Sequence, residues 1–163
     1  MKKYPIDKLV QDISKEIKNN NPTKIVIDLR HNSGGNSHVI HPLIEYFKSK
    51  DIFISNKVYV CIGRNTYSSG SINALDFCRN KVILIGEPTG GSSISYGEVL
   101  YFELPNSKSR IHYTIKLFNL RDCENKQYKK GTNTIEPQIR IPIYSNDYLE
   151  GKDKVLEFII NDN

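Results

Sequence analysis

Apolar residues recur at helical spacing over the first twenty residues of the chain. They stand at positions 6, 9, 10, 13 and 17, which is the pattern of an amphipathic helix. Pro5 suits the first turn of a helix, and the asparagine run that leads to Pro22 should end it. The pattern therefore predicts a helix over residues 5 to 19.

Three short apolar runs follow, and each has the length and composition of a strand buried on both faces. They are residues 24 to 29, 58 to 62 and 82 to 85. Helical spacing returns between them, near Ser37, where Ile40, Leu43, Ile44 and Phe47 share one face, and again near Ser71. Strands that alternate with helices predict an α/β fold with a mainly parallel sheet.

The second half of the chain has a different pattern. Residues 98 to 104 and 110 to 118 resemble strands, and Pro105, Asn106 and Ser107 form a turn-rich link between them, so we expect a β-hairpin. Residues 119 to 134 are polar and are expected to form an exposed loop. A closing helix is expected over residues 155 to 160.

Composition bounds the classes of function. A chain of 163 residues with 38% hydrophobic residues can bury one sizeable core, so we expect a single domain over residues 1 to 163. The net charge of +5 comes from scattered lysines and arginines rather than a stripe or tail, which indicates a solvated surface and no nucleic-acid partner.

Three cysteines, Cys61, Cys78 and Cys123, are too few and too unevenly spaced for a disulfide framework. They form no CxxC pair, so we expect no structural zinc and no other metal. Cys61 and Cys78 lie in apolar stretches, where a free cysteine is usually a small buried hydrophobe. The sequence has no apolar run of the roughly 18 to 20 residues that a membrane-spanning helix needs.

Ser68 is the serine with the most suggestive local setting. It lies in the polar segment 65 to 70, between an expected strand and an expected helix. A serine at the start of a helix has unpaired backbone amides and the positive end of the helix dipole close by, which favours an oxyanion. On local grounds the same position also suits a helix-capping serine.

Gly34 and Gly35 follow the first expected strand. Loops after neighbouring parallel strands meet at one edge of the sheet, so these glycines could bring backbone amides beside Ser68. Glycine permits that close approach.

Five segments, in order along the chain, match short motifs. Residues 27 to 35 resemble a DLRxNxGG segment, 66 to 69 a TxSS stretch, and 86 to 90 a GEPT-G turn. Residues 96 to 98 match a YGE signature, and 151 to 153 resemble a GKD before a terminal helix. Together these segments resemble the motifs of the tail-specific (C-terminal processing) serine peptidases, family S41, in which the TxSS stretch carries the nucleophile.

The resemblance implies a fold and a mechanism. The fold would be the spiral of ββα units shared with Clp protease and crotonase. Ser68 would be the nucleophile, with oxyanion-hole amides from Ser69 and from Gly34 or Gly35. The substrate would be a peptide or protein bound along an exposed strand, with no cofactor. The family acts mostly outside the cytoplasm or at the cell envelope.

The general base is not evident from the sequence. Many members of the family use a lysine shortly after the GEPT turn, but residues 90 to 95 contain none. Other branches use a histidine upstream of the DLR segment. The earlier strand and the PDZ-type module that are typical of this family are also missing from the sequence. We therefore expect the chain to be the C-terminal part of a longer protein.

Several residues of the chain could assist or replace that base. His112 and Lys116 share a face of one expected strand and are candidate bases, while Glu98 could orient a base or bind substrate. His38 and His41 are expected to be solvent exposed. Asp28 and Arg30 are expected to shape their loop.

Two other functions stay open beside an active peptidase. One is a pseudo-peptidase that binds peptides but has lost its base. The other is an acyl-CoA enzyme on the same broad fold, which would have no use for residues 66 to 69. A usable base within reach of Ser68 discriminates between peptidase and pseudo-peptidase.

Overall fold

A four-stranded parallel sheet forms the centre of the molecule. The computed structural model describes residues 5 to 92, 94 to 119 and 134 to 162. The strands are β1 (Lys24–Asp28), β2 (Lys57–Ile62), β3 (Val82–Gly86) and β6 (Ile139–Arg140), and they are ordered β1-β2-β3-β6. All neighbouring pairs are parallel. The predicted fold class, α/β with a mainly parallel sheet and a β-hairpin in the second half, is confirmed.

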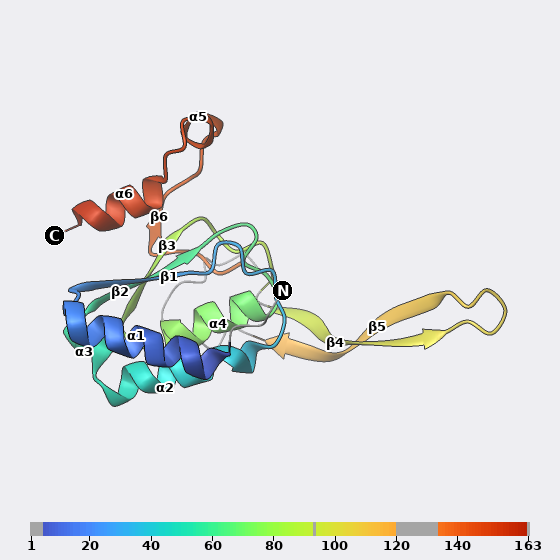
Figure 1. Cartoon of the computed structure of the whole chain (residues 1–163). Coiled ribbons are helices and arrows are strands. Elements are labelled where there is room, and N and C mark those ends of the chain that lie inside the picture. The colour runs from blue at the N-terminus through green and yellow to red at the C-terminus, as the bar shows by residue number, and fades with distance from the viewer. Residues whose placement is uncertain (1–4, 93, 120–133, 163) are drawn as a thin grey trace.

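One face of the sheet is covered by helices from the first half of the chain (Figure 1). These are α1 (Ile6–Asn20), α2 (His41–Ser49), which follows the 3-10 helix η1 (Ser37–Ile40), and α4 (Ser69–Cys78). The short helix α3 (Ile52–Ser55) leads into β2. Alternate strand residues such as Val58, Val60 and Leu84 pack beneath these helices as the main core.

The opposite face is covered mainly by the last helix, α6 (Lys154–Asn161), which lies beyond the small helix α5 (Ser145–Leu149). Val155 and Ile159 of α6 pack on Tyr59, Cys61 and Ile85, the intervening residues of β2 and β3. The two cores use opposite strand faces because side chains alternate along a strand. The central strands are therefore buried on both faces.

The prediction that the first strand is also buried on both faces is wrong. All residues of β1 are at least partly exposed, and the side chain of Val26 is 39% exposed. β1 is the edge strand of the sheet, and α6 packs over β2 and β3 instead. An apolar run alone does not reveal whether a strand lies at the centre or at the edge.

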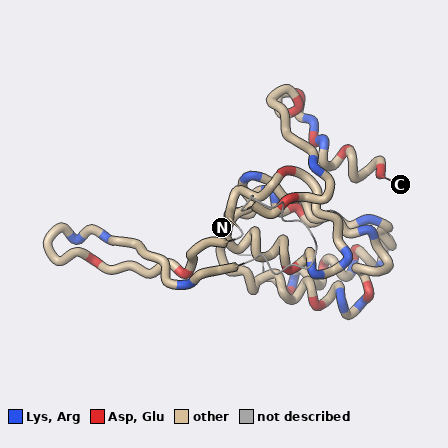
Figure 2. Tube along the Cα trace, turned by 180° about the vertical axis from the view of Figure 1, so that it is seen from behind, with Lys and Arg blue, Asp and Glu red and all other residues tan. Residues whose placement is uncertain are grey.

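The remaining boundaries differ from the predictions by a few residues. Helix α4 begins at Ser69, two residues earlier than expected, so Ser68 occupies the position just before the helix. β4 (Ile94–Glu103) also begins earlier than expected and pairs with β5 (Arg110–Asn119) as an antiparallel hairpin. The hairpin projects from the body as a long arm (Figures 1 and 2).

Some predictions lie outside the described residues. The expected exposed loop falls almost wholly on residues 120 to 133, and Cys123 lies among them. Within the described ranges, no helix is both long enough and apolar enough to cross a membrane. Positively and negatively charged residues alternate along the helices of the body (Figure 2).

Candidate active site

Ser68 stands at the junction between β2 and α4 with an unusual backbone conformation. Its φ of 51° and ψ of −122° lie outside the regions that residues with a side chain prefer. A residue held in such a region costs about 1–3 kcal/mol, and such residues cluster at functional sites. In the part of the chain that the structure describes, its hydroxyl makes no capping hydrogen bond to α4. The structure therefore does not support the alternative hypothesis that Ser68 is a helix-capping serine.

Gly34 lies directly against the Ser68 side chain. A β-carbon at Gly34 would stand 3.0 Å from the β-carbon of Ser68 and 3.4 Å from its Oγ. Gly34 also has a φ of 130°, which a residue with a side chain rarely adopts. Glycine is required here both by its conformation and by the approach of the loop to Ser68.

Asn32 holds this loop against the start of α4. Its backbone carbonyl accepts a hydrogen bond from the amide of Tyr67 at 3.0 Å. A β-carbon at Gly70 would lie 2.3 Å from that carbonyl oxygen, so the close packing depends on a second glycine. The loop after β1 and the turn after β2 thus form one rigid unit.

Two backbone amides near Ser68 are available as donors. The side-chain oxygen of Asn32 accepts a hydrogen bond from the Gly34 amide at 3.1 Å, so that amide is already engaged. The amides of Gly35 and Ser69 donate to no acceptor among the described residues. Of the two glycines predicted as alternatives, Gly35 has the free amide.

Thr66 joins three loops beneath the site. Its side chain is fully buried, donates to the carbonyl of Leu29 at 2.8 Å and accepts from the amide of Gly63 at 2.9 Å. Its backbone carbonyl accepts from Gly90, in the turn after β3, at 3.2 Å. Three strand ends are therefore fixed relative to Ser68.

Ser68 opens into a cavity of about 520 Å³. Its walls come from the loop before α2, the start of α4, the turn after β3 and the root of the hairpin. The polar side chains that line it belong to Asn36, Ser37, His38, Tyr67, Ser68, Ser69, Ser92, Ser95, Tyr96, Glu98 and Lys116. A cavity of this size with convergent polar groups is typical of a ligand site.

The structure separates the two candidate bases on the hairpin. Lys116 lines the cavity, and its Nζ lies 3.0 Å from a carboxylate oxygen of Glu98 in an ion pair. Glu98 has a φ of 54° and also lines the cavity. His112 lies further along the arm, opposite Tyr101, and is not among the cavity's lining residues.

His38, for which we expected only solvent exposure, also lines the cavity. It is exposed, but its exposed side borders the cavity that Ser68 also lines. Its ring lies edge-to-face on that of His41, with 5.0 Å between centroids, and Nε2 of His41 lies 3.4 Å from a carboxylate oxygen of Asp76. Its position three residues after Gly35 was the available signal in the sequence.

Arg30 ties the loop after β1 to the start of α6. Its guanidinium donates to both oxygens of Asp28 and to both oxygens of Asp153, at 3.0 and 2.8 Å in the latter case. Asp153 also caps α6 by accepting from the amides of Val155 and Leu156. The expected structural role of Asp28 and Arg30 agrees with these contacts.

These contacts set the ionisation of the cluster. The Arg30 hydrogen bonds hold the pKa of Asp153 below its usual range. Burial works to raise the pKa of Asp28, but its hydrogen bonds with Arg30 outweigh burial and lower it. Burial also raises the pKa of the Cys61 thiol to about 12, so this cysteine is not a nucleophile at neutral pH.

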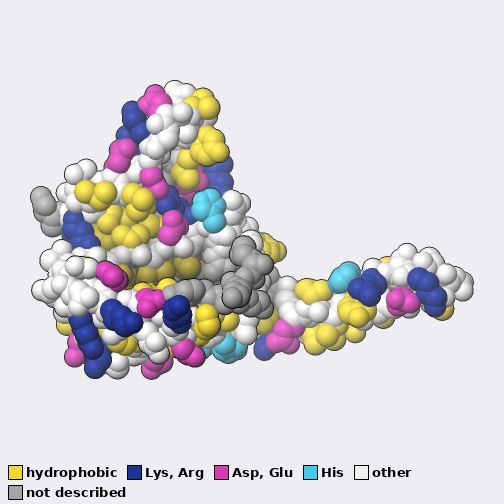
Figure 3. Space-filling view, viewed as in Figure 1, with side chains coloured by type: hydrophobic (Ala, Val, Ile, Leu, Met, Phe, Trp, Pro, Cys, Tyr) yellow, Lys and Arg dark blue, Asp and Glu magenta, His cyan; other side chains and the backbone are white. Residues whose placement is uncertain are grey.

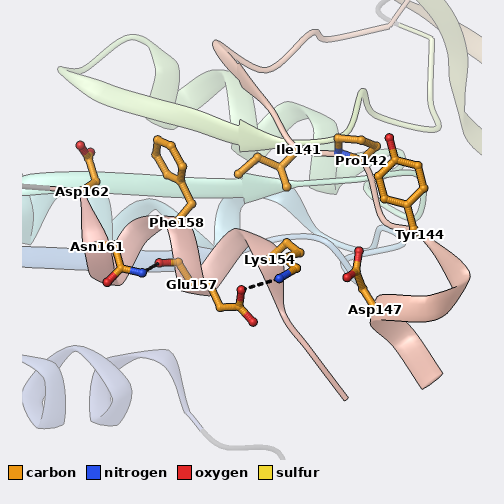
Figure 4. A pocket seen from close by; sticks show the side chains of 9 residues that line it. All are labelled: Ile141, Pro142, Tyr144, Asp147, Lys154, Glu157, Phe158, Asn161 and Asp162. Carbon is orange, nitrogen blue, oxygen red and sulfur yellow. Dashed lines mark hydrogen bonds and ion pairs between the residues drawn. The ribbon is translucent and has the colours of Figure 1, made fainter. Parts of the chain in front are cut away.

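A second cavity, of about 750 Å³, lies between α6 and the segment that leads from β6 to α5 (Figure 4). It is lined by Ile141, Pro142, Tyr144, Asp147, Lys154, Glu157, Phe158, Asn161 and Asp162. The ammonium of Lys154 is paired with Glu157 at 2.8 Å. The lining contains no serine, cysteine or histidine, so although larger, this cavity is the weaker candidate for nucleophilic chemistry. Over the described ranges, no three His, Cys, Asp or Glu side chains are grouped as metal ligands.

Comparison with known proteins yields structural similarity only. No protein-family model and no curated protein matches the chain. A Bacteroides fragilis protein assigned to the S41 proteases superposes with a TM-score of 0.54 at 17% identity, over 88% of this chain and 43% of that one. Tricorn protease superposes with a TM-score of 0.51 at 16% identity, over 85% of this chain and 14% of that one. A lipoprotein from Streptococcus agalactiae gives a TM-score of 0.48 at 17% identity, over 98% and 64% of the two chains.

The chain therefore spans less than half of the first two structures. The predicted S41 likeness is confirmed at the level of the fold, whereas the tail-specific branch and the spiral shared with Clp protease and crotonase stay predictions. The chain has the α/β fold of the S41 proteases.

Proposed function

We propose that this chain is the core of a serine peptidase that cleaves peptide bonds through an acyl-enzyme on Ser68. One observation carries the proposal: Ser68 is held at a positive φ with its hydroxyl uncommitted to the helix, beside two amides that have no acceptor in the described part of the chain. A serine nucleophile needs an uncommitted hydroxyl, and an oxyanion hole needs unpaired donors beside it. The five sequence segments support the tail-specific branch of the family.

The chemistry assigns a role to each group. Oγ of Ser68 attacks the peptide carbonyl carbon while a base takes the hydroxyl proton. The amides of Gly35 and Ser69 donate to the oxyanion that forms on the carbonyl oxygen. The C–N bond then breaks, the protonated base gives its proton to the leaving amine, and water releases the acyl group by the reverse sequence.

His38 is the best-placed base among the described residues. It lines the Ser68 cavity, and its contact with His41, itself beside Asp76, restricts its ring. Lys116 also lines the cavity, but the Glu98 ion pair must break before its amine can accept a proton. His112 does not line the cavity that Ser68 lines, so we do not propose it as the base. Glu98 then positions Lys116 for contacts with substrate.

The substrate class follows from the cavity walls. The root of β4, residues 95 to 99, forms one wall, and an exposed strand can bind an extended peptide by main-chain hydrogen bonds. A peptide laid there would pass Ser68. We infer a peptide or protein substrate and no cofactor.

Covalent labelling tests the proposal. The wild-type chain, Ser68→Ala and Ser95→Ala are treated with a fluorophosphonate and read by intact mass. We expect one adduct on the wild type and on Ser95→Ala, which removes another hydroxyl from the same cavity. We expect no adduct on Ser68→Ala, because loss of the nucleophile removes at least about a thousandfold of rate.

A peptide-binding pseudo-peptidase is the second candidate. It is favoured by the absence of a lysine from residues 90 to 95 and by the ion pair that engages Lys116. If the folded wild type forms no adduct but retains peptides on a column, the binding function replaces the peptidase. Labelling at a residue other than Ser68 would refute both the nucleophile and the site.

A further inference from the structure

The β4–β5 arm has one apolar face that is exposed along its whole length. The register pairs Tyr96 with Leu117, Leu100 with Tyr113 and Phe102 with Ile111, and Ile115 continues the same alternation. Phe102 and Tyr113 touch, with ring centroids 6.1 Å apart. We name these seven side chains the apolar arm face. They are between 40% and 65% exposed.

The opposite face of the arm, here called the polar face, carries the arm's charged side chains together with Val99 and Tyr101, which are 61% and 56% exposed. There Tyr101 lies against His112 and under the guanidinium of Arg110, and Lys116 lies over the ring of Phe118. Glu98 would alternate onto the apolar arm face, but its φ of 54° redirects the chain and its carboxylate pairs with Lys116 instead. The arm thus keeps its charges off the apolar arm face.

The arm is not stabilised by the body of the protein. Among the described elements, β4 and β5 make substantial contact only with each other. Hydrophobic side chains are visible along the projecting arm in Figure 3. An isolated two-stranded hairpin is marginal in water, and a hydrophobic face needs further strands or a helix to pack against. The alternation predicts a buried face, yet the residues that the structure describes leave it exposed.

We propose that the apolar arm face binds the same face of a second copy of this chain, so that two arms pack as a four-stranded sandwich in a twofold dimer. A face without charged residues is complementary to itself, as a twofold interface requires. Two such ribbons can pack face to face at the usual spacing of about 10 Å.

The area available agrees with a dimer. If each side chain offers at most about 200 Å² when fully exposed, a value for aromatic residues, the apolar arm face presents at most about 700 Å² per copy at the observed exposures. Two copies would bury at most about 1,400 Å², and this upper bound lies within the range of stable protein interfaces. A lipid surface is the less favoured occupant, because the cationic Arg110 and Lys116 lie on the opposite, polar face and would point away from the headgroups.

Sedimentation equilibrium of the full chain tests this inference, with matched variants on adjacent rungs of the same strand. Ile115→Lys places a charge in the apolar arm face, and Thr114→Lys places the same charge on the polar face. We expect a dimer for the wild type, at least a tenfold higher dissociation constant for Ile115→Lys, and less than a twofold change for Thr114→Lys. Leu100→Lys, on the other strand, should repeat the effect of Ile115→Lys.

Three outcomes would overturn the inference. The wild type could sediment as a monomer up to about 100 μM. Its association would then be weaker than that of specific dimers with an interface of this size. A dimer that tolerates Ile115→Lys and Leu100→Lys would use another surface. A monomeric wild type that binds phosphatidylcholine–phosphatidylglycerol vesicles, with binding lost in Ile115→Lys, would assign the face to membrane. The experiment does not involve Ser68 labelling, so it stands or fails independently of the peptidase proposal.

Discussion

The starts of helices α4 and α6, at Ser68 and Asp153, differ in how the backbone amides of the first turn are paired. At α6, Asp153 has an ordinary extended conformation and accepts hydrogen bonds from two amides of the first turn. At α4, Ser68 has a positive φ and its hydroxyl caps no amide within the described ranges. A helix start is normally completed by a capping side chain. The contrast indicates that α6 begins where stability requires it, whereas α4 begins where an oxyanion could be held.

Replacement of His38 should produce the largest change, a slower labelling of Ser68. It tests whether the uncapped start of α4 supports chemistry. If His38 is the base, His38→Ala should slow fluorophosphonate labelling of Ser68 by about 100-fold or more, because a positioned base contributes rate of that order. Added imidazole should restore part of the rate by occupying the vacated space. Time courses of intact mass give both rates.

His112→Ala is the matched control for this prediction, since that imidazole lies outside the cavity. It should label as the wild type does. Equal rates for His38→Ala and the wild type would leave Ser68 as nucleophile but transfer the role of base to another residue. Slowing without rescue by imidazole would indicate a structural role for His38.

Removal of the capping carboxylate at the start of α6 should lower the stability of the protein. Asp153→Ala removes the cap of α6 and one of the two carboxylates that bind Arg30. We expect the free energy of unfolding to fall by about 2 kcal/mol, from the lost cap and the charged hydrogen bonds. Urea unfolding measures the change. Asp147→Ala, at a carboxylate on neighbouring α5, should change stability by less than about 0.5 kcal/mol.

The same variant has a defined pH dependence. The pKa of Asp153 is lowered in the folded protein from an ordinary value of 3.8, so its ionised form stabilises the fold above that value. This contribution is lost as pH falls through the folded pKa. The stability difference between wild type and Asp153→Ala should therefore be full at pH 7 and shrink below about pH 4. A difference that is constant between pH 7 and pH 3 would contradict the assigned ion pair.

Ser68→Gly should give the smallest effect, with a sign opposite to that at Asp153. Glycine relieves the backbone strain at a φ of 51°, and we expect Ser68→Gly to be more stable than Ser68→Ala by about 1 kcal/mol. At an unstrained position alanine is the more stable of the two. If alanine is the more stable variant here, Ser68 is not strained and the contrast between the two helix ends is lost.

The fold could be predicted from the sequence where apolar periodicity determines structure. The spacing in residues 5 to 19 predicted helix α1, and the three apolar runs predicted strands β1, β2 and β3, because burial of apolar side chains dominates the energetics. The two-residue strand β6 and the edge position of β1 could not be found, because both depend on strand order rather than on local pattern.

The site was predictable in its residue types but not in its geometry. Glycine beside serine suggested an oxyanion hole, yet the choice of Gly35 depends on the side-chain oxygen of Asn32, which engages Gly34. The apolar spacing predicted a helix from near Ser37, but it could not show that the first turn, which carries His38, is a 3-10 helix. The positive φ of Ser68 could not be predicted, because a serine in the sequence does not indicate its backbone conformation.

Arg30 joins two parts of the chain that are 123 residues apart in sequence. During synthesis from the N-terminus, the loop that carries Gly34 and Gly35 is made well before Asp153, the residue that anchors it through Arg30. Domains fold as units once their parts are available. We therefore expect a nascent chain that contains Ser68 but not yet Asp153 to lack the contact that anchors this loop.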